Sequence, residues 1–131
     1  MTRNAINVEG AATVGPYSHA VEAGGFLFLS GQTPINPKTK ELVRGSVAQQ
    51  TDQCIANLFA VLSAADLTPD DVVSVQVYLT DMGDFADMNG AYSRHFSKPF
   101  PARTTIGCAS LPMNARVEIG MTARRRTGSQ G

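Results

Sequence analysis

The chain has 131 residues, of which 43% are hydrophobic and 17% charged, with 11 acidic and 11 basic side chains. This length suits a single domain, and the composition excludes a disordered chain. The balanced charge argues against a general nucleic-acid-binding protein, because such proteins depend on clustered positive charge. We therefore expect one globular domain over residues 1–131, part of whose surface contacts another subunit.

The two cysteines, Cys54 and Cys108, lie far apart in the chain and form no Cys-x-x-Cys or Cys/His cluster. We therefore expect neither a metal site nor another cofactor site built on them. Two thiols without a signal-peptide pattern predict a cytoplasmic location. No apolar stretch approaches the roughly 18 residues that a membrane span needs, so we expect no contact with a membrane.

The N-terminal part of the chain predicts strands. Residues 5–8 suit a short edge strand, and residues 19–23 suit a strand that ends at the turn signal Gly24-Gly25. Residues 26–29 form a continuous apolar run, which is typical of a strand buried on both faces. The last two segments together predict a hairpin.

A helix is predicted from about residue 47 to residue 65, after a loop over residues 31–40. Ser46 followed three residues later by Gln49 matches a capping box, which marks a helix N-terminus. Apolar residues then recur at helical spacing, at Ile55, Leu58, Phe59 and Leu62. This stripe predicts that one side of the helix faces a core.

Residues 72–79 predict a strand, because apolar and polar residues alternate along them. The apolar set that we expect on one face is Val73, Val75, Val77 and Leu79. A second helix is predicted from about residue 84 to residue 96, where Pro99 and Pro101 follow. Asp81, Asp84 and Asp87 cluster at its start, where acidic residues favour a helix N-terminus, so we expect no metal there.

The last two strands are expected at residues 103–109 and 116–123. In the final strand, Glu118 alternates with apolar neighbours and therefore faces away from the helix-covered side of the sheet. This element order, ββαβαββ, predicts an α+β fold with one mixed sheet and two helices on one face. The opposite face carries Phe28 or Tyr78, which predicts that it is covered by oligomerisation. We expect residues from about 124 to 131, which include three consecutive arginines, to form a flexible, solvated tail.

Arg103 is the most informative single residue, because it follows two prolines at the head of a predicted strand. A guanidinium group offers a fixed fork of donors that matches a carboxylate. With Glu118 on the next strand, Arg103 indicates a site for a small organic acid. The alternative is a structural ion pair between Arg103 and Glu118 or another acid.

Short motifs along most of the chain resemble those of the RidA (YjgF/Rid) family of reactive intermediate deaminases, also labelled endoribonuclease L-PSP. They are Gly15-Pro16-Tyr17-Ser18-His19-Ala20, Ser30-Gly31-Gln32, Val77-Tyr78-Leu79-Thr80-Asp81-Met82, Asn89-Gly90-Ala91-Tyr92, Pro101-Ala102-Arg103-Thr104-Thr105, and Leu111-Pro112 followed by Val117-Glu118-Ile119. Each motif is weak alone, but six in this order and spacing are specific.

The resemblance implies a chorismate-mutase-like fold, a homotrimer with sites between subunits, and no cofactor. It implies hydrolysis of 2-imino or 2-enamino acids, such as 2-iminobutanoate and 2-iminopropanoate, to 2-keto acids and ammonia. By position, Arg103 matches the carboxylate-binding arginine of the family, and Glu118 matches the glutamate near the attacking water. The pocket residues match Tyr17, Ser30, Gly31, Asn89 and Thr105; Thr105 stands where many members carry cysteine, and His19 replaces the commoner glutamine.

Three other functions stay open from the sequence. The chain could be a related deaminase of aminoacrylate or 2-aminomuconate, a non-catalytic trimer that binds small acids, or an RNA-directed protein. The balanced charge counts against the RNA-directed protein.

Overall fold

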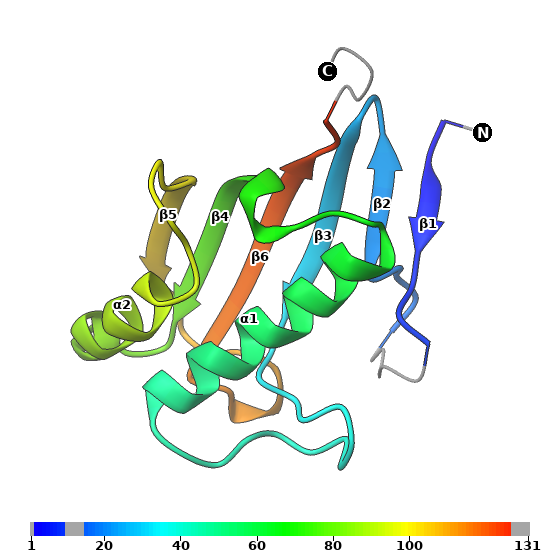
Figure 1. Ribbon diagram of the computed structural model, residues 1–131. Helices are drawn as coiled ribbons and strands as arrows, with labels where there is room; N and C mark the ends of the chain where they lie inside the picture. Colours follow the sequence, from blue (N-terminus) through cyan, green and yellow to red (C-terminus); the bar gives the residue numbers. More distant parts are fainter. Residues whose placement is uncertain (1, 10–14, 127–131) are drawn as a thin grey trace.

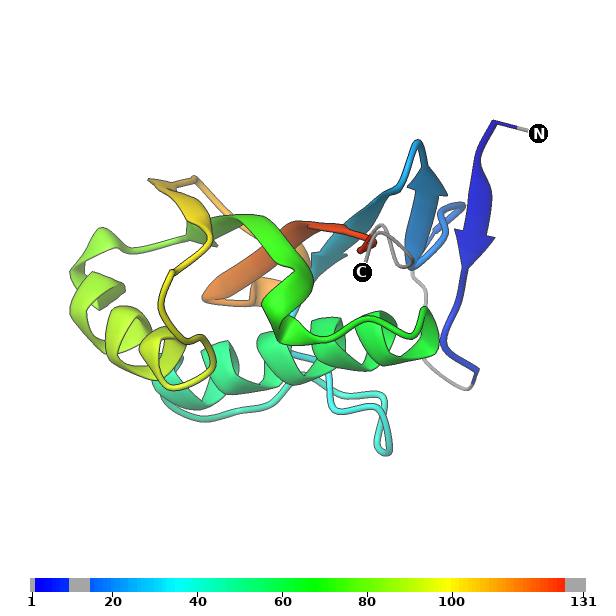
Figure 2. The ribbon, with the colours of Figure 1, turned by 45° about the horizontal axis from the view of Figure 1, so that its top comes forward.

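The computed structural model describes residues 2–9 and 15–126, and its centre is a six-stranded mixed sheet with the order β1-β2-β3-β6-β4-β5 (Figure 1). Two helices lie on one face of this sheet, and Figure 2 shows both on the same side. β4 and β5 pair in parallel, whereas the other pairs are antiparallel. The predicted α+β fold with one mixed sheet is confirmed. The elements are β1 Asn4–Ile6, β2 Ala20–Ala23, β3 Phe26–Gln32, α1 Val47–Ala64, β4 Val72–Leu79, α2 Phe85–Ser93, β5 Ala102–Gly107 and β6 Val117–Arg124, with short 3-10 turns at Pro69–Asp71, Met82–Asp84 and Pro112–Asn114.

α1 begins at the capping box that the sequence predicts. The Gln49 N–H donates to Ser46 Oγ (3.1 Å), and the Ser46 N–H donates back to Gln49 Oε1 (2.8 Å). These bonds satisfy backbone donors that a helix N-terminus otherwise leaves without partners. The buried face of α1 then packs on the sheet through Cys54, Ile55, Leu58, Val61 and Leu62.

The predicted inward set of β4 is wrong at Val73. Val75 is 0% exposed beneath the helices, but Val73 is 43% exposed. A β-bulge causes the difference: Val72 pairs with Ala123 and Ser74 with Thr122, so β4 has one extra residue at this point. The bulge turns Val72 inward in place of Val73.

β3 is buried on one face of the chain only, contrary to the prediction of burial on both faces. Leu27 and Leu29 face the helices and are buried, whereas Phe28 is 50% exposed on the other face. The hairpin of β2 and β3 is confirmed, and Gly24 and Gly25 both have a positive φ in its turn. An exposed phenylalanine at the centre of a strand marks the uncovered sheet face as unusually apolar.

α2 ends at Ser93, three residues before the predicted end at Phe96. The N–H groups of Arg94 and His95 donate to carbonyls three residues back, which tightens the last turn. His95 Nε2 then lies 2.7 Å from Asp52 Oδ1 on α1, and the Phe96 ring stacks on Tyr92 at 4.8 Å. Contacts with α1 and with α2 itself therefore replace the last helical turn.

The C-terminal arginines are held against the domain as far as the structure describes them, in contrast to the expected solvated tail. Arg125 donates two hydrogen bonds of 2.8 Å to Glu22, and Arg126 donates to both oxygens of Asp71. Residues 127–131 of that expected tail lie outside the described residues. In both pairs a guanidinium group reaches both oxygens of one carboxylate, which is the strongest geometry for an arginine ion pair.

Among the described helices, none combines the length and the apolar character that a bilayer span requires. The same part of the chain contains no group of three or more His, Cys, Asp or Glu side chains arranged to hold a metal ion.

The bulge in β4 predicts different costs for two neighbouring valine substitutions. Val75→Ala should lower the free energy of unfolding by about 2 kcal/mol, because it leaves a cavity in the core. Val73→Ala should change it by less than about 0.5 kcal/mol, because Val73 is exposed. Urea denaturation of both variants measures this, and equal losses would contradict the bulge.

Candidate functional site

Arg103 and Glu118 lie on opposite faces of the sheet. Arg103 pairs in register with Val75, which is buried beneath the helices, so the Arg103 side chain lies on the helix-covered face. Glu118 pairs with Tyr78, one position away from the buried Val77 and Ile119, so it lies on the uncovered face. The direction predicted for Glu118 is confirmed, but one chain does not bring Glu118 and Arg103 together.

Arg103 lines a cavity of about 400 Å³ between α2 and β5. We call it the arginine pocket; its walls are Asn89, Tyr92, Ser93, Phe100, Pro101 and Arg103. The guanidinium carbon of Arg103 lies 4.7 Å from the centre of the Tyr92 ring and 5.7 Å from that of Phe85. Two rings of α2 therefore hold the cation by cation–π contact and limit its movement.

The Arg103 guanidinium has no ion pair and no hydrogen bond to any residue that the structure describes. Four other arginines, Arg94, Arg116, Arg125 and Arg126, each pair with an aspartate or glutamate. The alternative of a structural ion pair between Arg103 and Glu118 is therefore wrong for a single chain. The donors of Arg103 face the cavity and are available to a ligand.

Two further predicted residues lie near Arg103. Asn89 is exposed on α2, and its amide makes no hydrogen bond to a described residue. Thr105 is on the same face of β5 as Arg103, and its Oγ1 is buried without a hydrogen-bond partner in the described chain. The nearby Tyr92 hydroxyl is likewise buried and unbonded. Burial raises the pKa of Tyr92, and the charge of Arg103 offsets this in part.

Glu118 lines a second cavity, of about 350 Å³, on the uncovered face. We call it the glutamate pocket; its walls are Tyr17, Ser30, Gly31, Thr33, Pro112, Met113 and Glu118. Three residues predicted from the sequence, Tyr17, Ser30 and Gly31, thus meet Glu118 there. The seven predicted site residues fall into two groups on opposite faces, one with Arg103 and one with Glu118.

A bulge in β3 builds the glutamate pocket. Leu29 pairs with Met121 and Gln32 pairs with Ile119, so β3 has one extra residue between them. Ser30 and Gly31 occupy the bulge, where the Ser30 hydroxyl donates to the Ser18 carbonyl (2.7 Å). A Cβ atom at residue 31 would overlap the Glu118 carboxylate, so glycine is required there while that carboxylate keeps its place.

Burial of the half-buried Glu118 carboxylate raises its pKa above the usual range for glutamate. No cation and no hydrogen-bond donor of the described chain contacts this carboxylate to offset the effect. A carboxylate with a raised pKa is a stronger base, which suits a group that takes a proton from water.

Sequence reasoning missed part of both pockets. Met113 and Pro112 close the glutamate pocket from the 3-10 turn before β6, where Met113 and Asn114 have a positive φ; Pro112 belongs to a family motif but was not predicted to line the site. Phe100 and Ser93 complete the arginine pocket. Asn114 offered a weak signal, because asparagine tolerates a positive φ, but nothing in the sequence indicated Phe100 or Ser93.

Comparison with known proteins decides the family. A family model described as endoribonuclease L-PSP matches residues 8–125 of this chain. A RutC family protein of Pyrococcus horikoshii is 47% identical over 106 residues, which cover 81% of this chain and 84% of that protein. The chain belongs to the RidA/YjgF family.

Other members of the RidA/YjgF family extend this result. A protein of Dermatophagoides farinae named 2-iminobutanoate/2-iminopropanoate deaminase is 42% identical over 106 residues, which are 81% of this chain and 83% of that protein. The crystal structure of RidA from the Antarctic bacterium Psychrobacter matches with a TM-score of 0.88 and 38% identity, and the match covers 92% of this chain and 98% of the other. The yeast protein YEO7 matches with a TM-score of 0.91 and 36% identity over 95% of this chain and all of the other.

For this RidA-family chain, the raised pKa of Glu118 predicts how Glu118→Gln changes stability. A carboxyl group whose pKa is higher in the folded state destabilises the fold once it is ionised, and has no such effect when protonated in both states. The change in the free energy of unfolding caused by Glu118→Gln should therefore be more favourable at about pH 7, where Glu118 is ionised, than at about pH 4, where it is largely protonated. Urea denaturation of both proteins at the two pH values measures the difference.

Glu22→Gln is the control of opposite sign. The hydrogen bond from Arg125 lowers the pKa of Glu22, so its stabilising effect is present near neutrality and is lost as the pH falls through the folded-state pKa. This variant should lose stability at about pH 7 and little at low pH. The same sign for both variants would contradict the assignment of Glu118.

Proposed function

We propose that this chain hydrolyses 2-imino and 2-enamino acids, such as 2-iminobutanoate and 2-iminopropanoate, to 2-keto acids and ammonia. The observation that carries the proposal is the unpaired guanidinium of Arg103 beside a cavity of about 400 Å³. All these substrates contain a carboxylate, which a guanidinium fork binds through two parallel hydrogen bonds. The similarity to a protein named as such a deaminase supports the same reaction class.

The complete site, in this proposal, forms between subunits of a homotrimer. The arginine pocket of one copy faces the glutamate pocket of the next, because the sheet itself separates the two pockets of a single chain. The uncovered sheet face supports this arrangement: Phe28 and Ile106 are 50% and 46% exposed there. A contact between two different faces closes into a ring when it repeats around a threefold axis.

Arg103 and Glu118 have separate roles in the reaction. Arg103 binds the carboxylate and holds the imine carbon next to a water molecule on Glu118, which is a proximity effect. Glu118 accepts a proton from this water as the oxygen bonds to the imine carbon, and it then returns this proton to the nitrogen, which has received the C=N electron pair. The hydroxyl proton of the resulting tetrahedral adduct then passes to the nitrogen through Glu118. The C–N bond breaks as the C=O bond forms, ammonia leaves, and the 2-keto acid remains on Arg103.

In this proposal, the other predicted residues bind the substrate or form the walls of the site around Arg103 and Glu118. The exposed Asn89 amide next to Arg103 can donate to the substrate, and Thr105 has a free hydroxyl on the same face. The Ser30 hydroxyl already donates a hydrogen bond to the Ser18 carbonyl, so toward a substrate it can only accept one. An enamine substrate also needs a proton on carbon, and Tyr17, which is 44% exposed in the glutamate pocket, or a water molecule is the candidate donor in this proposal.

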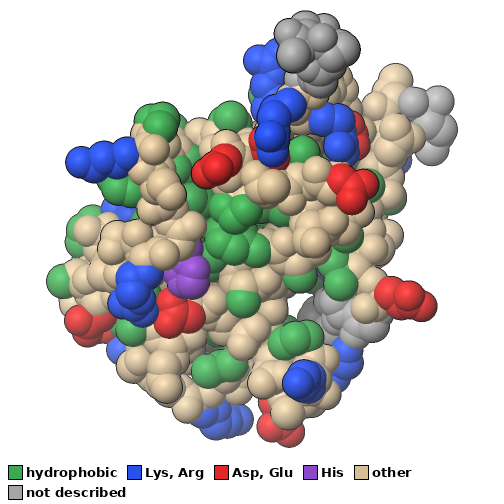
Figure 3. All heavy atoms as spheres, viewed as in Figure 1, with side chains coloured by type: hydrophobic (Ala, Val, Ile, Leu, Met, Phe, Trp, Pro, Cys, Tyr) green, Lys and Arg blue, Asp and Glu red, His purple; other side chains and the backbone are tan. Residues whose placement is uncertain are grey.

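The surface argues against a function based on RNA. On the helix-covered face, positive and negative side chains are interspersed, as Figure 3 shows. The C-terminal Arg125 and Arg126, the strongest basic feature of the sequence, are paired with Glu22 and Asp71. RNA binding depends on unpaired positive charge along a surface.

Arg103→Ala is expected to lower kcat/KM for imine hydrolysis by about 100-fold or more, because the substrate loses its bidentate partner. A threonine dehydratase supplies 2-iminobutanoate in the assay, and release of 2-ketobutyrate is followed over the uncatalysed rate. Arg94→Ala is the control, since Arg94 is an exposed arginine that pairs with Asp52 and lines neither pocket.

Full activity of Arg103→Ala would refute the proposed function. A wild-type protein that binds 2-ketobutyrate without accelerating imine loss would be a small-acid-binding protein, and would refute it as well.

Mixing two inactive variants tests the shared site. Arg103→Ala and Glu118→Gln each damage every site when present alone. When the two are denatured together and refolded in equal amounts, about one quarter of the sites should receive intact Arg103 from one copy and intact Glu118 from the other. The measured rate should recover to about that fraction of the wild-type rate.

As the control, the two variants are refolded separately and mixed afterwards. This mixture should stay inactive as long as the trimers do not exchange subunits, because every trimer then contains only one variant. No recovery after joint refolding, with trimers present by light scattering, would contradict a site shared between copies.

A further inference from the structure

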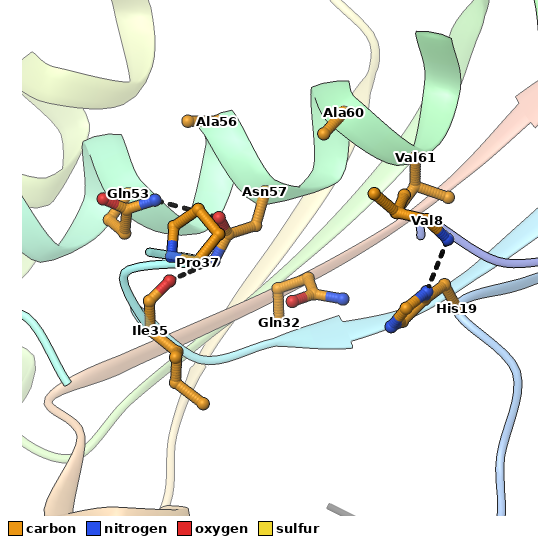
Figure 4. Close-up of a pocket in the computed structure, with 10 residues that line it drawn as sticks. All are labelled: Val8, His19, Gln32, Ile35, Pro37, Gln53, Ala56, Asn57, Ala60 and Val61. Atoms are coloured by element: carbon orange, nitrogen blue, oxygen red, sulfur yellow. Dashed lines mark hydrogen bonds between the residues drawn. The ribbon is translucent and has the colours of Figure 1, made fainter. Parts of the chain in front are cut away.

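We infer that a third cavity, between α1 and the chain that follows β3, binds a small uncharged molecule. Its volume is about 160 Å³, and it contains none of the seven predicted site residues. Figure 4 shows Ala56 and Ala60 on the α1 side, and Gln32 and His19 on the sheet side. This cavity lies on the helix-covered side of the sheet and is distinct from both pockets of the proposed active site.

The lining selects against charged ligands. Among the residues that the structure describes, no Asp, Glu, Lys or Arg side chain lines the cavity, and most of its wall is apolar, including Ile35 and Pro37. An ion that entered would lose water without gaining an opposite charge, which is costly. The arginine and glutamate pockets each contain a charged residue, so this cavity differs from them in the class of ligand that it accepts.

Most polar groups around the cavity are already bonded to the protein. Asn57 donates to the Ile35 carbonyl (2.9 Å) and accepts from Gln53 (2.9 Å). His19 is buried, and its Nδ1 accepts from the Val8 N–H (2.9 Å). These groups hold the walls in place.

Gln32 is the exception. Its half-buried amide makes no hydrogen bond to any residue that the structure describes, and it points into the space between Asn57 and His19 (Figure 4). An amide offers both donors and an acceptor, and no protein group of the described chain uses those of Gln32. A ligand with one amide or hydroxyl group would satisfy them.

Size and polarity together define the ligand. An apolar cavity of about 150 Å³ is large enough for a benzene ring. The expected ligand is therefore an uncharged molecule of about that size, with an apolar ring or branched chain and one hydrogen-bonding group for Gln32. Small alanines at positions 56 and 60 of α1 leave the room that it occupies.

Benzamide is the probe, and benzoate, which has the same shape but a negative charge, is the matched control. In a titration followed by ¹H–¹⁵N NMR, benzamide should shift the amide signals of residues around the cavity and reach saturation in the millimolar range. Benzoate should leave these signals unchanged, although it can shift signals near Arg103. Equal binding of both probes at the cavity, or saturable binding of neither, would overturn the inference.

Two substitutions on one helix test the location. Ala60→Leu fills the cavity and should abolish benzamide binding, whereas Ala64→Leu, one turn further along α1 and also exposed, lies outside the lining and should bind normally. Circular dichroism confirms that both variants fold. Unchanged binding by a folded Ala60→Leu would overturn the inference.

Gln32→Met tests the polar contact, because it keeps the length of the side chain and removes the amide. Benzamide binding should weaken by about fivefold, which corresponds to one hydrogen bond. Unchanged affinity would overturn the role assigned to Gln32. None of these measurements depends on deaminase activity, so their outcome is separate from that of the proposed function.

Discussion

The alternation of side chains along β-strands, interrupted by a bulge, determines on which face of the sheet each candidate site residue lies. Alternation on β5 and β6 sends Arg103 toward the helices and Glu118 to the uncovered face. The bulge in β3 turns Ser30 and Gly31 toward Glu118 and leaves Gln32 beneath α1. Without this extra residue, the strand would present a different set of side chains to each face.

Arg103 is distinctive because it combines the lack of an ion pair with a position in a pocket wall. Four of the eight arginines, Arg94, Arg116, Arg125 and Arg126, pair with a nearby acid, in several cases through two hydrogen bonds. Arg103 instead lies against aromatic rings, which hold a cation but leave its hydrogen-bond donors unused. This combination orients the group while keeping it available, which is what recognition of an incoming anion needs.

Much of the fold could be predicted from local patterns. The Ser46–Gln49 capping box, the Gly24-Gly25 turn and the direction of Glu118 depend on neighbours within a few residues, and the structure confirms each. The errors came from longer-range contacts. Val73 follows the alternation in sequence but not in space, because a bulge depends on the partner strand, and the last turn of α2 is lost to contacts with α1.

The candidate site divides in the same way. Which residues carry chemistry could be predicted from their types and motifs, but their separation onto two faces depends on the register of β4 with both of its neighbours. Phe100 and Met113 enter the pockets only through the path of the loops, which no periodic pattern encodes.

The close approach of Gly31 to Glu118 has a consequence for how this sequence can change. A methyl group at residue 31 would take the volume that the carboxylate occupies, so the two positions are not independent. Because this carboxylate is the far end of a flexible side chain, an alanine at residue 31 would displace it from its present place rather than disrupt the backbone. An aspartate at residue 118 would withdraw the carboxylate by about one methylene length and make room for that alanine, so the effects of changes at the two positions should not add.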